Sequence, residues 1–241
     1  HILFLKKIML MFKKEVQSLR LGDGDTFHGE GILAVTKALL QSGVSYVGGY
    51  QGAPISHLMD VLADAQGILD ELGVHLETCA NEAGAAAMLG ASINYPLRGA
   101  VTWKATVGTN VASDALSNLA SAGVKGGALL VVGEDYGEGA SIIQERSHAF
   151  AMKSQIWLLD PRPNLTTIVD MVEQGFQLSE ASSTPVMLEL RIRACHVRGS
   201  FETKANRQPE FSRRNVLENP DFDYGKICLP PSTYAQEKQK I

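Results

Sequence analysis

Residues 44–62 read VSYVGGYQGAPISHLMDVL. The apolar start of this stretch, residues 44–47, is typical of a short buried strand, and the glycines that follow are typical of a turn. Leu58, Val61 and Leu62 then recur at helical spacing, and Pro54 stands at a position that the first turn of a helix tolerates. The stretch therefore predicts a strand, a glycine loop and a helix, in that order.

The same order recurs along the chain. Further apolar segments predict strands over residues 74–79, 99–103, 128–132, 156–159 and 186–190. Helical spacing predicts helices over residues 31–41, 80–93, 108–120 and 165–180. Short apolar strands that alternate with helices are typical of a parallel sheet covered on both faces. We therefore predict an α/β fold of three layers, in which a doubly wound, mostly parallel sheet lies between helices.

The expected domain occupies residues 29–195. Residues 1–28 are interpreted as an N-terminal extension, and its short apolar beginning as a leader or an expression-derived segment. After residue 195 the sequence becomes polar and contains prolines, so residues 196–241 are predicted to form an extended C-terminal arm or a linker to further domains.

Composition excludes several classes of function. Lys and Arg number 22 against 26 Asp and Glu, a net charge of −4, which provides no basic surface for nucleic acid. Cys79, Cys195 and Cys228 lie far apart, so they indicate neither a disulfide framework nor an iron–sulfur site. We expect a cytoplasmic protein without a membrane segment.

Ligands of such sheets bind beyond the carboxyl ends of the strands. The loops expected there are residues 48–54, 79–83, 104–110 and 133–146. The glycines of the first loop would let backbone N–H groups approach a phosphate, but the loop lacks both G-x-G-x-x-G and G-K-[ST]. A tight turn into the helix is the simpler interpretation.

Glu82 is the most informative carboxylate, because it opens a predicted helix made largely of small residues. An acid in the first helical turn is favoured by the helix dipole, and Asn81 before it is ordinary capping chemistry. The same position would place Glu82 at the ligand-binding edge, where a carboxyl group in apolar surroundings can share a proton with a ligand nitrogen. Both interpretations remain open at this point.

A second acidic group follows the strand predicted over residues 128–132. Glu134, Asp135 and Glu138 could supply oxygen ligands to Mg²⁺ or Ca²⁺, although a solvated acidic loop is the simpler interpretation. The six histidines show no metal-ligand spacing and no G-x-S-x-G motif occurs. We therefore predict no metal site on this chain.

Several stretches together resemble one family. They are GYQGAPIS (49–56), NEAGAAAMLGAS (81–92), TWKATVGTNVASDALSNLASAGVKGGALLVVGEDYGEGASIIQERS (102–147) and LPPSTYAQEKQK (229–240). In this order they resemble the alpha subunit of indolepyruvate:ferredoxin oxidoreductase, among the thiamine-diphosphate-dependent 2-oxoacid:ferredoxin oxidoreductases. The resemblance spans about residues 29–240 and concerns the N-terminal, pyrimidine-binding domain of that subunit.

The resemblance implies a thiamine-diphosphate-binding fold of the pyrimidine-binding type. In this family one glutamate hydrogen-bonds the aminopyrimidine ring and promotes the tautomer that removes the thiazolium C2 proton, and Glu82 matches it. The resemblance implies further cofactor contacts from the other matched loops, at Tyr50, Gly52, Ala53, Pro54, Thr109 and Asn110.

The family's reaction is the oxidative decarboxylation of a 2-oxoacid, here an arylpyruvate, to an acyl-coenzyme A. The resemblance implies that the diphosphate-binding domain with its Mg²⁺, and the module with iron–sulfur clusters, lie on further domains or chains. Coenzyme A and ferredoxin or another electron acceptor would be partners. Tight packing of small-sided helices leads us to expect a homodimer or a larger oligomer.

Two departures from the family pattern stand out. Ala53 replaces a threonine that is common in the family and whose hydroxyl faces the substrate. The GDGDT segment at residues 22–26 resembles the start of a diphosphate–magnesium site, but the asparagine that should follow is missing, so we predict a loop there. Two alternatives stay open: the pyrimidine-binding subunit of a non-oxidative 2-oxoacid decarboxylase, and a non-catalytic interaction domain.

Overall fold

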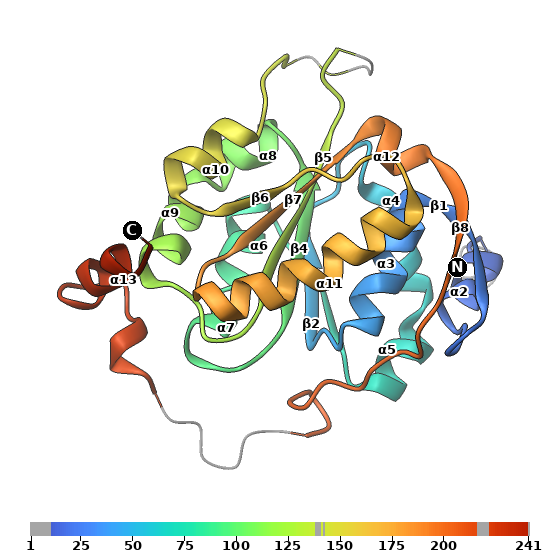
Figure 1. Ribbon diagram of the computed structural model, residues 1–241, viewed down its shortest axis with the longest axis horizontal. Coiled ribbons are helices and arrows are strands. Elements are labelled where there is room, and N and C mark those ends of the chain that lie inside the picture. The colour runs from blue at the N-terminus through green and yellow to red at the C-terminus, as the bar shows by residue number, and fades with distance from the viewer. Residues whose placement is uncertain (1–10, 138–140, 142, 216–221, 241) are drawn as a thin grey trace.

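A computed structural model of the chain describes residues 11–137, 141, 143–215 and 222–240 (Figure 1). The main sheet has six parallel strands in the order β3-β2-β4-β5-β7-β6. Their bounds are Tyr46–Gly49 for β2, His75–Thr78 for β3, Gly99–Lys104 for β4, Ala128–Glu134 for β5, Trp157–Leu159 for β6 and Val186–Arg191 for β7. All six predicted strands are therefore present, and the parallel α/β class is confirmed.

The strands divide their side chains between two apolar clusters, one on each face. In β5, Leu129 and Val131 belong to one cluster, whereas Leu130 and Val132 belong to the other. This split follows from the alternation of side chains along a strand, and it explains why a strand buried on both faces is apolar throughout. Figure 1 shows the resulting layers, with helices on both sides of the sheet.

Each helical layer has its own members. One layer contains α3 (Gly31–Gln41), α4 (Ser56–Asp64), α5 (Gln66–Leu72), α11 (Leu165–Ser182) and α12 (Ile192–His196). The other contains α6 (Glu82–Met88), α7 (Ala91–Asn94), α8 (Val107–Val111), α9 (Ser113–Ala122) and α10 (His148–Ser154). The helices predicted over residues 80–93 and 108–120 are thus each divided into two.

The start of α4 differs from the prediction. Pro54 does not lie in the first helical turn, because α4 begins at Ser56 and the Ala53–Pro54 peptide bond is cis. The N–H groups of Ile55 and Ser56 both donate to the carbonyl of Gly52, so a turn comes between the loop and the helix.

A second, two-stranded sheet joins the two ends of the predicted domain. β1 (Thr26–Glu30) pairs antiparallel with β8 (Arg198–Glu202), and α2 (Lys13–Leu19) packs beside β1 and α3. Leu19, Phe27 and Phe201 belong to the same apolar cluster as α3 and α11. The sequence did not predict this sheet, and the expected boundaries at residues 29 and 195 fall inside β1 and α12.

Residues beyond β8 are only partly extended. After an irregular stretch and the 3₁₀ turn η1 (Tyr224–Lys226), the chain ends in α13 (Ser232–Lys240), which contacts α9. The Gln236 amide donates to the carbonyl of Ser183. The described part of the predicted arm therefore folds back onto the domain.

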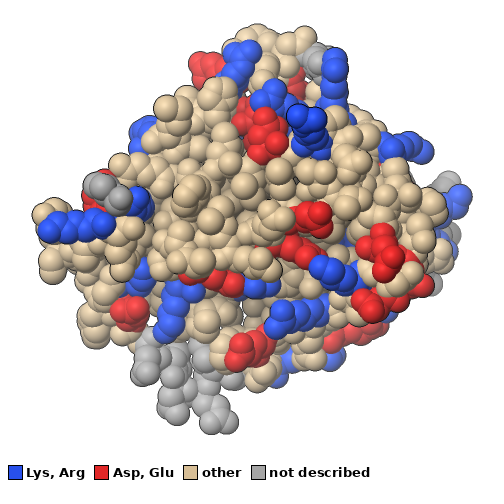
Figure 2. Space-filling view, viewed as in Figure 1, with Lys and Arg blue, Asp and Glu red and all other residues tan. Residues whose placement is uncertain are grey.

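The surface in Figure 2 has Lys, Arg, Asp and Glu interspersed over the face shown, rather than gathered by sign. Ion pairs such as Arg98–Glu180 and Lys204–Glu173 belong to this pattern. Within the described residues, no helix has both the length and the apolar character that a membrane crossing requires.

Candidate active site

Three loops meet at the carboxyl edge of the main sheet, where all six parallel strands end. The Cys79 amide donates to the carbonyl of Gly49, 2.8 Å away, which ties the loop after β3 to the end of β2. A Cβ atom on Gly133 would lie 2.8 Å from the Cβ of Ile55 and 3.2 Å from the Cδ of Pro54. The loop after β2 therefore rests directly on the end of β5.

The loop of residues 50–54 forms a tight turn. The Tyr50 N–H donates to the Thr102 carbonyl at 3.0 Å, and the Tyr50 side chain is 40% exposed. A Cβ on Gly52 would lie 2.6 Å from the Cβ of Lys104, so only glycine allows this approach. Ala53 is exposed and Pro54 is buried. The turn interpretation of this loop is confirmed.

Glu82 lies at the start of α6 and is 6% exposed. Asn81 caps the helix by accepting a hydrogen bond from the Gly84 N–H at 2.8 Å. The Glu82 carboxylate itself has no hydrogen bond or ion pair with any described residue. The Glu82 oxygens are not among the fully buried polar atoms that lack a partner, so they reach solvent at this edge. Because Asn81 performs the capping, the Glu82 carboxylate remains available to a ligand.

Residues 104–110 connect the two predicted cofactor loops. Lys104 lies against Gly52, as described above, and Gly108 lies against Glu82, because a Cβ there would be 2.8 Å from the Glu82 Cγ. Trp103 is fully buried and forms the neighbouring wall, 2.4 Å from the same Cβ position. The loop of residues 50–54 and Glu82 thus lie at one edge of the sheet, and segment 104–110 contacts both.

Thr109 and Asn110 take different places. Thr109 is fully buried, and its hydroxyl accepts from the Trp103 indole N–H at 3.3 Å and pairs with the Ser147 hydroxyl at 3.4 Å. Asn110 is exposed. The Thr109 side chain is therefore engaged in the interior wall behind Glu82, whereas Asn110 faces outward.

Lys104 adds a cation that the sequence reasoning did not single out. Its ammonium lies 2.7 Å from a carboxylate oxygen of Asp135, and 22% of its side chain is exposed. The signal was its place as the first residue of the predicted loop, directly after the strand predicted over residues 99–103. The pair brings β4 and β5 together at the edge where Tyr50 and Gly52 lie.

The acidic group after β5 is not a solvated loop. Glu134 and Asp135 are 2% and 6% exposed, because both lie at the end of a strand buried on both faces. Glu138 lies outside the described residues. Among the described residues, no group of three or more His, Cys, Asp or Glu side chains could hold a metal ion.

Glu189 is an acid that the sequence reasoning missed. It lies in the otherwise apolar strand β7, is 1% exposed, and stands beside Glu134 of the neighbouring strand. Burial, together with the adjacent carboxyl group of Glu134, raises the pKa of Glu189 to about 8. Its sequence signal was a single acid inside the apolar run VMLELR.

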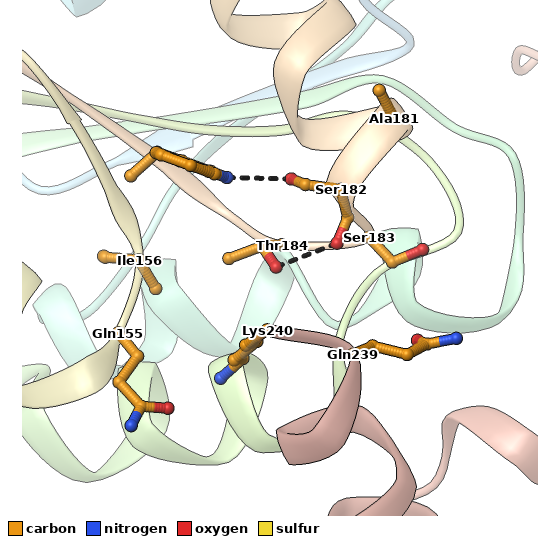
Figure 3. Close-up of a pocket in the computed structure, with 9 residues that line it drawn as sticks. Gln155, Ile156, Ala181, Ser182, Ser183, Thr184, Gln239 and Lys240 are labelled. Carbon is orange, nitrogen blue, oxygen red and sulfur yellow. Dashed lines mark hydrogen bonds between the residues drawn. The ribbon is translucent and has the colours of Figure 1, made fainter.

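A separate cavity of about 610 Å³ lies at the opposite edge of the sheet, before β6 and β7 begin (Figure 3). Its polar groups largely satisfy one another: the Trp157 indole donates to the Ser182 hydroxyl and the Thr184 hydroxyl to the Ser182 carbonyl. Lys240 of α13 reaches its rim. This cavity contains none of the predicted site residues.

The fold is shared with a solved structure. The structure is similar to a solved structure titled 2-oxoglutarate:ferredoxin oxidoreductase from Magnetococcus marinus with 2-oxoglutarate, coenzyme A and succinyl-CoA bound. The TM-score is 0.67 over 90% of this chain and 44% of that one, at 17% identity. At this identity the likeness concerns the fold alone, and it confirms the predicted α/β class.

Relatives in sequence point to a narrower group of proteins than the fold does. The chain is 30% identical over 200 residues to the indolepyruvate oxidoreductase subunit IorA of Methanothermobacter marburgensis, and 29% identical over 199 residues to that of Archaeoglobus fulgidus. These matches cover 83% and 82% of this chain but 31% of each relative, so the chain spans about a third of their length. No family model matches the chain. The resemblance to indolepyruvate oxidoreductases is confirmed.

Proposed function

We propose that this chain is the pyrimidine-binding part of a thiamine-diphosphate-dependent 2-oxoacid:ferredoxin oxidoreductase of the indolepyruvate type. The whole enzyme would decarboxylate an arylpyruvate oxidatively and form an acyl-coenzyme A. The similarity to indolepyruvate oxidoreductase subunits supports this assignment, and favours it over the non-oxidative decarboxylase and the non-catalytic domain.

The single observation that supports the assignment most is the state of Glu82. Glu82 is a largely buried residue at the carboxyl edge of a parallel sheet, and its carboxyl oxygens reach solvent there without a partner among the described residues. A ring nitrogen of an aminopyrimidine would supply the missing partner, and Glu82 would hold a proton at that nitrogen. A carboxyl group within hydrogen-bond reach of a nitrogen base can exchange a proton with it.

The residues around Glu82 fit the pyrimidine half of the cofactor. Gly108 packs closely against the Cγ of Glu82 and against the buried Trp103 ring, so both form an apolar wall beside the side chain of Glu82. Tyr50, Gly52, Ala53, Pro54 and Asn110 would line the approach from the neighbouring loops, with Thr109 holding the wall behind them. When bound, thiamine diphosphate supplies the carbanion chemistry that releases carbon dioxide from a 2-oxoacid.

The remaining chemistry would belong to partners. The described residues contain no metal-binding group, so a diphosphate-binding domain, on another chain or on further residues of the same one, would provide the Mg²⁺ site. Iron–sulfur clusters, ferredoxin and coenzyme A would also act outside this domain, and association into a homodimer or larger oligomer remains our proposal. The predicted cytoplasmic location stays a prediction.

Ala53 bears on the choice of substrate. It is exposed at the loop that would face the substrate, and it offers a methyl group where relatives commonly have a hydroxyl. We propose that this favours a 2-oxoacid with an apolar or aryl side chain. Ala53→Thr in the complete enzyme would then lower kcat/KM for arylpyruvates relative to small polar 2-oxoacids.

The test of the assignment is Glu82→Gln in the complete enzyme, purified with its partner modules. Turnover of indolepyruvate with a viologen acceptor should fall by about 10²-fold or more, because a glutamine cannot exchange the proton. Glu77→Gln is the matched control, since Glu77 lies on the neighbouring strand β3 with an exposed side chain. Equal turnover in Glu82→Gln and the control would contradict the assignment.

A further inference from the structure

Two buried carboxyl groups lie side by side at the ends of β5 and β7. One Glu134 oxygen accepts the backbone N–H of Ser147, and its other oxygen has no hydrogen-bond partner. Neither oxygen of Glu189 has a hydrogen-bond partner, and the nearest cationic atom is the Arg191 Nε, 3.4 Å from one of them. Three buried carboxyl oxygens therefore lack a donor.

Leaving three buried carboxyl oxygens without a donor costs free energy, and so does keeping two carboxylate charges close together away from water. A single proton between the two groups lowers both costs, because it neutralises one charge and donates a hydrogen bond from one carboxyl group to the other. The structure contains no other described donor for these oxygens.

The pair is also connected to the candidate active site. Ser147, whose N–H binds Glu134, is fully buried, and its hydroxyl meets the Thr109 hydroxyl at 3.4 Å. Thr109 accepts the indole N–H of Trp103, and Trp103 and Glu82 pack on the same side of Gly108. A continuous line of buried contacts thus runs from the acid pair to the wall beside Glu82.

We propose that Glu134 and Glu189 share one proton, and that this proton positions the Trp103 indole against Glu82 through Ser147 and Thr109. Both acids are positioning residues, and their bearing on catalysis rests on the proposed function. Loss of the shared proton leaves two adjacent buried anions, which repel each other and pull on the N–H of Ser147.

Other charged groups facing the pair set the pH at which this happens. Asp160 after β6 disfavours ionisation of Glu189, whereas Arg191 favours it. Asp160 and Arg191 are themselves paired at 2.6 Å. His148 of α10 lines the same cavity of about 510 Å³ as Glu189, and the Tyr136 ring lies 5.9 Å from the Arg191 guanidinium. The raised pKa of Glu189, at about 8, places the loss of the proton at mildly alkaline pH.

The experiment follows the Trp103 indole N–H by ¹⁵N NMR in the full chain with Trp157→Phe, so that one tryptophan remains. We expect its chemical shift to titrate with a midpoint close to that pKa. In Glu189→Gln the amide donates permanently to Glu134, so the resonance should keep its low-pH position throughout. Glu134→Gln, a second isosteric variant, should also lose the titration.

The matched control is Glu173→Gln. The Glu173 carboxylate pairs with Lys204 on the surface, so its replacement should leave the titration unchanged. An indole that does not titrate in the wild-type background, or that still titrates in Glu189→Gln, would overturn the proposal. This measurement needs neither cofactor nor substrate, so it is independent of the proposed function. In the complete wild-type enzyme we expect kcat/KM to fall at alkaline pH, and we expect this fall to be absent from Glu189→Gln. A complete wild-type enzyme without turnover would instead contradict the proposed function.

Discussion

Glu189 is an acid in a place that an apolar side chain would normally occupy. Its folded-state pKa of about 8 is far above its ordinary 4.5. The stability that this raised pKa contributes is fully present below the ordinary pKa, and it is lost as the pH rises through about 8. The acid pair therefore makes the fold weakest at alkaline pH.

The free energy of unfolding should show this loss directly. We expect urea unfolding of the wild-type chain to give a stability that declines between pH 4.5 and about 8. Glu189→Gln does not ionise, so its curve should be flatter over the same interval. Parallel curves for the two proteins would show that Glu189 titrates normally.

Lys37 changes the stability of the fold with pH in the opposite direction to Glu189. Its side chain is fully buried in α3, and its ammonium donates to the carbonyl of Leu19 and to the Asn206 side chain. Burial lowers the pKa of Lys37 from 10.5 to about 8. Between these two values the unfolded chain holds a proton that the folded chain has released, so stability rises with pH across this interval.

Lys37→Met should abolish that rise, because methionine has no proton to release. The measurement is the difference in unfolding free energy between wild type and variant at several alkaline pH values. Lys14→Met, at a described surface position of α2, is the control and should leave the slope unchanged. If the difference in unfolding free energy between wild type and Lys37→Met stays constant with pH, the slope does not come from Lys37.

At the scale of elements, Gly108 decides how α6 and α8 pack at the candidate site. An added Cβ would meet Trp103 at 2.4 Å and the Glu82 Cγ at 2.8 Å. We expect Gly108→Ala to destabilise the fold by about 1–3 kcal/mol through overpacking. It should also displace Glu82 and lower turnover of the complete enzyme.

Gly84→Ala is the matched control for that variant. Gly84 lies in α6 as well, but its added Cβ would meet only ordinary contacts at 3.5 Å and 3.8 Å. We expect it to be neutral or to stabilise by about 0.5–1 kcal/mol, because alanine is the better helix former. Equal destabilisation by both substitutions would mean that α6 tolerates no added methyl group, and that Gly108 has no special role.

The central strands could be predicted because strands buried on both faces are largely apolar, as residues 128–132 of β5 illustrate. The edge strands β3 and β6 are partly exposed and were predicted from their short apolar runs. The strand β1 could not, because its residues alternate in burial and its partner β8 lies about 170 residues away, beyond any local pattern. The same limit hid the acid pair. Glu134 and Glu189 each appear in sequence, but only the pairing of β5 with β7 brings them together.

The place of Glu82 was predictable for a local reason. It follows a strand and opens a helix, and the parallel sheet puts such positions at one edge. The internal use of the Thr109 hydroxyl was not predictable, since Trp103 and Ser147 reach it from other elements. Sequence thus indicated which loops form the site, whereas the partners of individual side chains required the structure.

At the scale of the whole molecule, the terminal segments fold with the α/β domain. Phe27 of β1 and Phe201 of β8 lie with ring centroids 4.8 Å apart inside the larger apolar cluster. We expect Phe27→Ala to destabilise the chain by about 3–5 kcal/mol and to leave a single unfolding transition. Phe222→Ala, at a half-exposed residue, should change stability little.

Two separate unfolding transitions in wild type or Phe27→Ala would contradict this integration of the ends. The measurement is urea unfolding followed by both far-ultraviolet circular dichroism and tryptophan fluorescence. Coincident curves are expected, because β1, α2 and β8 share one core with α3 and α11.

The cysteine content of the chain bears on where the electron transfer of the proposed reaction would take place. Its three cysteines are far apart, and those described are free. The electron transfer of the proposed reaction would therefore depend on clusters held elsewhere. This agrees with a chain that spans 31% of the length of its relatives.

The most direct measurement of the central claim is cofactor content. The protein would be purified together with its partner modules, and bound thiamine diphosphate and the visible absorbance of iron–sulfur clusters would be determined. We expect both, together with reduction of a viologen acceptor that depends on an arylpyruvate and coenzyme A. Thiamine diphosphate without clusters would indicate the non-oxidative decarboxylase, and a complex with neither would contradict the proposed function.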